Sequence, residues 1–476
     1  MVCLFWNASK FLPLRFDGCL GIGQCAIKPF IFIKIIILAD AFWAMAYCSY
    51  CGQSHNVGFV STRFMGTDGV SLETVKWAEV FESRCFSCYY FAGKLDRAAE
   101  RSSLCPEADF RHPVITEINK NIYGVYERGR FVTEKIQSVK NTIKDALYDF
   151  INRFELELLV IENALAIPLN IPLGLAITEV LCEIHIPAIA HHHDFFWERQ
   201  RFLTNAVSDY LKMAFPPHLP GVEHVVISSA AADQLSLRTG ISSRIIPNVM
   251  NFDTPPPPPD DYADDVRDSL GIGKDELFVL QPTRVVKRKG IDHAIELVHR
   301  LKQPAKLVIS HASGDEGYQY EQRIREYSQL MGVDTIFVAD IINDHRGMTA
   351  DGRKIYTLYD IYPHADLVTY PSNYEGFGNA FLEAVYFKKP IVVNTYSIYT
   401  VDIKPKGFSV IEIDGFVTEQ AVSDTRKVLG NPDLRQRLVE HNYEVARTYY
   451  SFGVLYKELG NLIAKATGCV HAEVNC

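Results

Sequence analysis

Short apolar runs that alternate with helical patterns constrain the fold of this chain more than any other feature of its sequence. In the first half the runs lie at 57–61, 86–91, 156–161, 184–190 and 225–228. Residues 70–82 and 135–153, between these runs, carry apolar side chains at helical spacing. Alternation of this kind predicts a parallel sheet with right-handed crossovers through helices.

The same pattern starts again after a stiff proline-rich spacer at 255–259. The second set of runs lies at 278–281, 306–310, 335–338, 366–370 and 390–394. We therefore predict two doubly wound, Rossmann-like α/β domains at 57–250 and 274–445, joined by a linker at 251–273. Residues 446–476 are expected to form a helix that crosses back to the first domain, and a tail.

The first 56 residues form an atypical N-terminal extension. Their apolar run at 30–47 contains Lys34 and Asp40, so it is poorly suited to span a membrane. Its basic leader is too long for an ordinary signal peptide. The extension could be a signal or anchor, a targeting segment or a non-native start. We expect a cytoplasmic protein, with an anchor left open by this stretch.

The net charge and the cysteine content exclude several kinds of binding site. A net charge of −9 argues against general binding to nucleic acid or anionic membranes. The Cys-x-x-Cys pairs at 48–51 and 85–88 are too far apart for an ordinary zinc ribbon, so we expect no metal. The odd number of cysteines, 11, fits reduced thiols better than a disulfide framework.

Residues 375–383, Glu-Gly-Phe-Gly-Asn-Ala-Phe-Leu-Glu, are the most informative short segment. They follow an apolar strand and open a helix, so Glu375 lies in the loop and Glu383 in the first helical turns. Gly376 and Gly378 let backbone N–H groups approach an anion. Carboxylates accept hydrogen bonds from sugar hydroxyls. The segment suits a nucleotide-sugar, although a plain strand-to-helix loop has the same pattern.

A basic loop follows the first strand of the second domain. It contains Arg284 and Lys289, which could neutralise a diphosphate, with Arg as a fork and Lys as a point charge. A solvated basic loop is the alternative. Its position at the carboxyl end of a strand favours a ligand role.

The first domain offers a second group of candidates. In His191-His-His-Asp194, successive side chains of an extended segment point in opposite directions, so a shared metal ion is disfavoured. We expect His193, held by a carboxylate neighbour, to reach a ligand, with a packed histidine cluster as the alternative. Further candidates for an acceptor or phosphate site are Gly66, Thr67, Asp68, Gly69, Asn163, Asp194, Arg199 and Arg201.

Four ordered motifs together resemble glycosyltransferase family 4, with the GT-B fold. They are the Pro371-Ser to Glu383 segment with its E-x7-E spacing, the Arg284 to Lys289 pair, His193-Asp194, and Ile246-Pro-Asn248. The resemblance covers the chain from about residue 57 onward. It implies two Rossmann-like domains whose strand edges face a cleft. One departure is Thr395-Tyr-Ser, which stands where the family often has Gly-Gly.

The resemblance also implies roles for these residues. Glu375 and His193 would act at the transferred sugar and are the catalytic candidates. Glu383 would bind the ribose, while Arg284 and Lys289 would bind the leaving diphosphate in place of a metal ion. The loop backbone would hold the sugar and phosphates through Gly376, Phe377, Gly378 and Asn379. No cofactor is implied beyond the nucleotide-sugar co-substrate.

Residues 162–201 resemble a subgroup that extends glucosylglycerate with mannose from GDP-mannose. The implied function is a retaining hexosyltransferase that uses GDP-mannose or UDP-glucose and a small, anionic or neutral, sugar acceptor. A lipid-linked acceptor, a homodimer and membrane association stay open. The alternatives are an inactive GT-B binding protein or a nucleotide-sugar epimerase.

Overall fold

The computed structural model describes residues 55–66, 69–313 and 317–467. The interpretations offered for residues 1–54, and the predicted site residues Thr67 and Asp68, lie outside the described residues. Residues 55–467 belong to one compact unit. Within the described ranges, no helix is both long enough and apolar enough to cross a membrane.

The first domain is built on a seven-stranded, wholly parallel sheet with strand order β3-β2-β1-β4-β5-β6-β7. The strands are β1 (His55–Val60), β2 (Phe86–Ala92), β3 (Ser102–Leu104), β4 (Leu158–Glu162), β5 (Ala188–His192), β6 (Val222–Val226) and β7 (Arg244–Ile245). Every residue of β4 and β5 is buried. Strands buried on both faces read as continuous apolar runs, which is why the sequence locates them.

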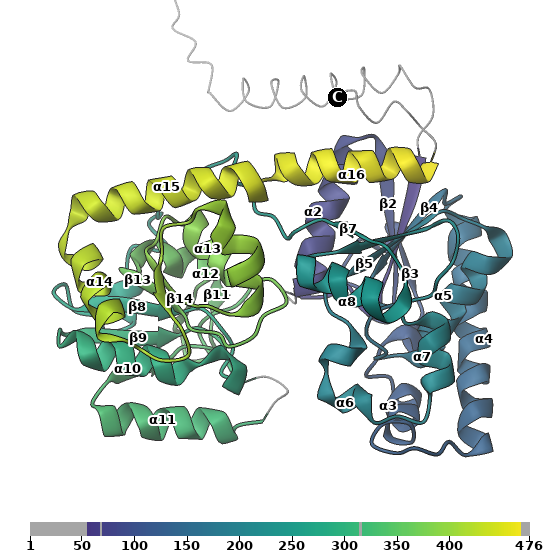
Figure 1. Cartoon of the computed structure of the whole chain (residues 1–476), viewed down its shortest axis with the longest axis horizontal. Coiled ribbons are helices and arrows are strands. Elements are labelled where there is room, and N and C mark those ends of the chain that lie inside the picture. The colour runs from purple at the N-terminus through teal and green to yellow at the C-terminus, as the bar shows by residue number, and fades with distance from the viewer. Residues whose placement is uncertain (1–54, 67–68, 314–316, 468–476) are drawn as a thin grey trace, which may run out of the picture. The chain divides into compact units, whose positions relative to one another are not determined.

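Helices cover both faces of this sheet (Figure 1). They are α2 (Gly69–Ser83), α3 (Pro113–Lys120), α4 (Arg130–Arg153), α5 (Ile171–Ile184), α6 (Gln200–Leu203), α7 (Ser208–Ala214) and α8 (Ser229–Thr239). The long helix α4 buries one stripe, which includes Ile136, Ile143 and Phe150. It packs on α5, which is apolar nearly all round because other elements surround it.

The second domain has a six-stranded parallel sheet with order β10-β9-β8-β13-β14-β15. Its strands are β8 (Leu277–Gln281), β9 (Ala305–Ile309), β10 (Asp334–Phe337), β13 (Leu367–Tyr370), β14 (Ile391–Asn394) and β15 (Ile411–Ile413). Its helices are α9 (Val266–Ser269), α10 (Ile291–Leu301), α11 (Gln319–Met331), α12 (Leu358–Ile361), α13 (Asn379–Tyr386) and α14 (Glu419–Gly430). The predicted class of two doubly wound α/β domains is confirmed.

Two last helices, α15 (Pro432–Tyr450) and α16 (Phe452–Thr467), follow one another (Figure 1). Leu455, Leu459 and Leu462 of α16 belong to the same apolar cluster as Val57 and Phe81 of the first domain. Tyr443 of α15 instead belongs to a cluster of the second domain. The two helices therefore contribute to the cores of both domains.

Some local features differ from expectation. The antiparallel pair β11 (Gly347–Met348) and β12 (Lys354–Ile355) was not predicted, because two-residue strands leave no periodicity to detect. Cys85 is disulfide-bonded, so the expectation of reduced thiols is wrong at that position. Cys88, Cys105 and Cys182 are free.

The packing of α4 gives a prediction about stability. Replacing Ile143, which is fully buried, by alanine should lower the free energy of unfolding by about 2–5 kcal/mol, since it removes apolar contacts and leaves a cavity. Denaturant unfolding followed by circular dichroism measures the change. Asp145→Ala, on the exposed face of the same helix, is the control and should change stability by less than about 0.5 kcal/mol. Equal effects of the two substitutions would contradict the assigned core.

Candidate functional site

The carboxyl edge of the second sheet places Glu375 against two cations. The residue lies in the loop between β13 and α13 and is 7% exposed. Its Oε2 accepts a hydrogen bond from Arg288 at 3.0 Å, and its Oε1 accepts one from Lys289. Lys289 is also buried. Glu375 is thus the counter-ion of Lys289, the residue predicted to meet the diphosphate.

Two loops must approach closely to form this ion pair. Gly290 follows Lys289 with a φ of +58°, and a Cβ there would overlap the carbonyl oxygen of Pro371. The backbone N–H of Asn373 donates to the carbonyl of Arg288 at 2.8 Å. A glycine at position 290 therefore allows the loop after β8 to pack on the loop after β13.

The ion pair sets the charge of its members. Burial alone would raise the pKa of Glu375, but Lys289 and Arg288 outweigh burial and lower it. Burial lowers the pKa of Lys289, and Glu375 opposes that shift. The carboxylate is therefore held ionised in the interior, where an unpaired charge would be costly.

Arg284 lies beside this pair and is exposed. Its carbonyl accepts a hydrogen bond from the N–H of Val286, but its guanidinium makes no hydrogen bond or ion pair with the residues that the structure describes. Burial lowers the pKa of His311, and the charges of Arg284 and Lys289 lower it further, so the three basic groups are neighbours. His311 was not predicted. Its place two residues after the end of β9, the strand next to β8, was the signal that could have identified it.

Glu383 is the fifth residue of α13, within its first turns, as the sequence indicated. Its Oε2 accepts a hydrogen bond from the hydroxyl of Tyr362 at 2.8 Å. Burial raises the pKa of Glu383, an effect that this bond opposes. Its assignment to a ribose stays a prediction, and Tyr362 is a neighbour that the sequence did not reveal.

The hydroxyl of Tyr396 supports the glycine loop at residues 376–378. Its hydroxyl donates to the carbonyl of Phe377 at 2.9 Å. Gly378 has a φ of +129°, and a Cβ at this position would overlap the Tyr396 hydroxyl. Tyr396 lies in the segment that departs from the family pattern, so this chain supports its loop with a phenol. Helix α13 then begins at Asn379, and the N–H of Phe381 donates to the carbonyl of Gly378 at 2.9 Å, so the N–H groups of Asn379 and Ala380 are those without a helical acceptor.

In the first domain, Glu162 ends β4 and binds two histidines. Its Oε2 lies 3.0 Å from Nδ1 of His191 and 3.3 Å from Nε2 of His193. His191 and His193 share one side of the extended segment, while His192 points the other way and pairs with His224 at 2.9 Å. The expectation that successive histidines point in opposite directions therefore holds here, and Glu162 supplies the expected carboxylate neighbour of His193.

The charges of this cluster differ from residue to residue. Burial would raise the pKa of Glu162, but His191 and His193 lower it to about 2. Burial lowers the pKa of His191 despite its contact with Glu162. For His193, burial is outweighed by Glu162, and the pKa is raised. The cluster is therefore a carboxylate with one neutral and one readily protonated imidazole.

Glu162, His191 and His193 could also hold a metal ion, since one ligand atom from each lies within 4.8 Å of the others. Both Glu162 contacts are, however, of hydrogen-bond length and use the same oxygen. We therefore treat the group as a hydrogen-bonded cluster. Among the described residues, Oε1 of Glu162 has no hydrogen-bond partner.

The other candidates of the first domain divide into two groups. Asn163 donates to Asp194 at 3.0 Å and accepts from the backbone N–H of His193, and Arg199 donates to Asp194 at 2.6 Å, so these residues are brought together. Arg201 lies over the ring of Phe202 instead. Gly66 donates its N–H to Asp96, and Gly69 begins α2.

Contacts join the candidate residues of the second domain to those of the first. The Tyr374 hydroxyl donates to Glu198 at 2.6 Å, and the Asn248 amide donates to Asn379 at 2.7 Å. A Cβ on Gly376 would lie 3.3 Å from the carbonyl oxygen of His193. The loop before α13 therefore meets the segment that follows β5.

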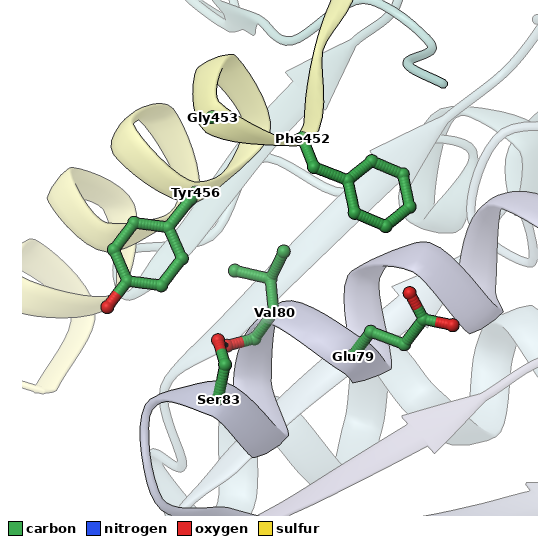
Figure 2. A pocket seen from close by; sticks show the side chains of 6 residues that line it. All are labelled: Glu79, Val80, Ser83, Phe452, Gly453 and Tyr456. Carbon is green, nitrogen blue, oxygen red and sulfur yellow. Dashed lines mark hydrogen bonds between the residues drawn. The ribbon is translucent and has the colours of Figure 1, made fainter. Parts of the chain in front are cut away.

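A hollow elsewhere on the molecule contains none of these residues. Glu79, Val80 and Ser83 of α2 line it with Phe452, Gly453 and Tyr456 of α16 (Figure 2). Its lining is mainly apolar, with Glu79 and Ser83 at its edge (Figure 2). It offers no group of polar side chains that could hold a nucleotide.

Comparison with known proteins agrees with this geometry. A family model described as glycosyl transferases group 1 matches residues 263–445. A mannosylglucosylglycerate synthase of Petrotoga mobilis is 31% identical over 75% of this chain and 86% of its own length. Another from Thermotoga maritima is 29% identical over 81% of this chain and 94% of its own length.

The fold has solved counterparts. A sucrose-phosphate synthase of Thermosynechococcus elongatus aligns with a TM-score of 0.61 at 15% identity, over 87% of this chain and 99% of that chain. At this identity the match supports the fold alone. The two domains thus have the GT-B arrangement of glycosyltransferases.

The Tyr396 contact generates a prediction. Gly378→Ala should destabilise the protein more than Gly407→Ala, since both have positive φ but only Gly378 has a neighbour that a Cβ would overlap. The difference should be about 1–3 kcal/mol, the usual effect of overpacking. Denaturant unfolding of the two variants measures it. If the variants are equally stable, Tyr396 does not confine this loop.

Proposed function

Because this chain belongs to the group 1 glycosyl transferases and is a hexosyltransferase, we propose that it moves mannose from GDP-mannose to a hydroxyl of glucosylglycerate, with retention at the anomeric carbon. The observation that best supports this reaction is the buried Lys289–Glu375 ion pair beside the glycine loop. The names of the relatives support the choice of substrates.

The donor half of the reaction needs positive charge for the leaving diphosphate. Arg284, Arg288 and Lys289 together carry three positive charges, and Glu375 balances one of them. A diphosphate that approaches this loop would take the cations as partners and release Glu375. The freed carboxylate could then accept hydrogen bonds from hydroxyls of the sugar. In this proposal the Lys289–Glu375 ion pair is exchanged for contacts with the donor.

Catalysis then follows from charge that is already in place. As the bond from the anomeric carbon to the diphosphate breaks, the sugar becomes oxocarbenium-like and the diphosphate gains negative charge. Fixed cations and the N–H groups at the start of α13 stabilise that charge without reorganising, which is usually the largest catalytic contribution. We propose that no divalent metal is required, and that the acceptor hydroxyl attacks on the face the diphosphate leaves and gives its proton to an oxygen of that leaving diphosphate. A trapped glycosyl-enzyme adduct would contradict this order of events.

The acceptor half is assigned to the first domain. His193 would lie near the transferred sugar, and Asn163, Asp194 and Arg199 form a polar group beside it. Arg199 is already paired with Asp194, so an acceptor carboxylate would have to share this guanidinium. Arginine has donors enough for two partners.

A donor and acceptor panel tests the proposed reaction. The full chain should form a disaccharide product from GDP-mannose only when glucosylglycerate is present, and EDTA should not stop it. UDP-glucose with the same acceptor is the matched comparison, and products are identified by mass spectrometry and NMR. Binding without product would favour an inactive binding protein. Free sugar released from a UDP-sugar without acceptor would favour an epimerase.

The Lys289–Glu375 ion pair gives a second prediction, which distinguishes effects on stability from effects on activity. Glu375→Ala should lower kcat/KM by about 10²-fold, the loss expected for charge-assisted hydrogen bonds. It should also cost about 3–5 kcal/mol of stability, because it leaves the buried Lys289 ammonium unpaired. The double variant Glu375→Ala, Lys289→Met removes both charges and should recover most of that stability, while its kcat/KM stays at or below that of Glu375→Ala.

Denaturant unfolding and steady-state kinetics give the two readings. Glu326→Ala, an exposed carboxylate on α11, is the control and should leave both unchanged. Full activity in Glu375→Ala would remove this residue from the site. A double variant as unstable as Glu375→Ala would show that the buried pair is not what the loss of Glu375 disturbs.

A further inference from the structure

The buried carboxylate of Glu162 has no role in the reaction as described so far. It is fully buried at the end of an otherwise apolar strand, a position that costs free energy unless the charge is paired. Its two partners are imidazoles, of which His193 is the more accessible, with 11% of its side chain exposed. The position of this ionised carboxylate indicates that Glu162 acts through the two histidines that it contacts.

The contact with Glu162 determines which ring nitrogen of His193 can bind a ligand. Glu162 meets Nε2 of His193, so that nitrogen carries the hydrogen and donates to the carboxylate. The backbone N–H of His193 donates to Asn163 and holds the main chain as well. Nδ1 of His193 makes no hydrogen bond to any residue that the structure describes. It is therefore the atom left for a ligand.

We propose that Glu162 is a positioning residue for sugar transfer, which holds the His193 imidazolium so that its Nδ1–H donates to an oxygen of the bound nucleotide-sugar. This inference rests on the proposed function, which puts His193 beside the transferred sugar. A cationic donor at this point would stabilise the negative charge that develops on the leaving side.

The surroundings of His193 favour this charge state. Glu162 on β4, Glu73 on α2 and Asp194 on the following segment all favour the cation, while His191 and His192 on β5 are the basic neighbours. Lys76 donates to Glu73 at 2.5 Å and moderates its charge. His191 stacks on Trp77 with ring centroids 4.1 Å apart and is fully enclosed, and this burial lowers its pKa, so that the extra proton of the pair goes to His193.

The test changes Glu162 to Gln, which keeps the shape of the side chain and removes its charge. The chain offers a matched control near the other end of β4. Glu157, just before β4, lies 2.7 Å from Nδ1 of His55, in a second carboxylate–imidazole pair that is exposed and at the opposite end of the strand. Glu157→Gln should therefore leave the reaction unchanged.

Two measurements are made on wild type and both variants. NMR titration of labelled histidines, with His193→Gln to assign the signal, gives the pKa of His193 without any substrate. In wild type it should lie above the ordinary value of about 6.5, and Glu162→Gln should lower it. In kinetics, Glu162→Gln should reduce kcat by about 10²-fold near neutral pH, with the KM for the donor little changed. The alkaline fall of its pH–rate profile should move to lower pH.

Several results would overturn the inference. One is a His193 pKa below the ordinary value in wild type, a reading that does not depend on whether Glu162→Gln folds. Another is a pH–rate profile unchanged by Glu162→Gln. A stoichiometric metal ion whose removal abolishes activity would replace the hydrogen-bonded cluster by a metal site. Failure of the proposed function is distinguishable, because wild type would then form no transfer product although the His193 titration still responded to Glu162→Gln.

Discussion

A carboxylate buried at the end of a parallel strand organises the polar residues of each domain. Glu162 ends β4, and Glu375 follows β13. Each is paired with two basic groups that come from the next strand in its sheet: histidines from β5 for Glu162, and the loop after β8 for Glu375. Parallel strands end at a common edge, so neighbours in the sheet supply the counter-charges that burial demands.

The two clusters differ in the charge that they leave uncompensated. In the second domain three cations face one carboxylate, so two positive charges remain for a ligand. In the first domain the Glu162 carboxylate balances a single imidazolium, and Glu73 is balanced by Lys76. Surplus positive charge is thus confined to the side assigned to the diphosphate. This asymmetry fits a division into a donor half and an acceptor half.

Much of the fold could be predicted because buried parallel strands leave a clear mark in the sequence. The runs at β1, β4, β8 and β13 are short and apolar, and amphipathic α4 shows its buried stripe. The strands β3, β7, β11 and β12 have only two or three residues and give no such mark. The disulfide of Cys85 was missed because residue spacing alone does not report pairing.

Individual residues of the site could be predicted from the sequence, but the contacts between them could not. Position after a strand identified Glu375, Lys289 and His193 as residues of the carboxyl edge. That Glu375 and Lys289 form an ion pair depends on the close approach of two loops, which Gly290 permits. Glu162 has a signal of its own in the sequence, because a lone acid that ends an apolar strand must find a partner for its charge inside the protein.

The ion pair also explains how these charges can lie together at the sheet edge. The cations crowded there would repel one another without Glu375, whose two oxygens each hold one of them. On the proposed function, a complete donor satisfies both sides, with diphosphate on the cations and sugar hydroxyls on Glu375. A nucleoside diphosphate alone satisfies the cations and leaves the carboxylate buried without a partner. On the proposed function, the return of Glu375 to Lys289 would therefore assist release of the product nucleotide.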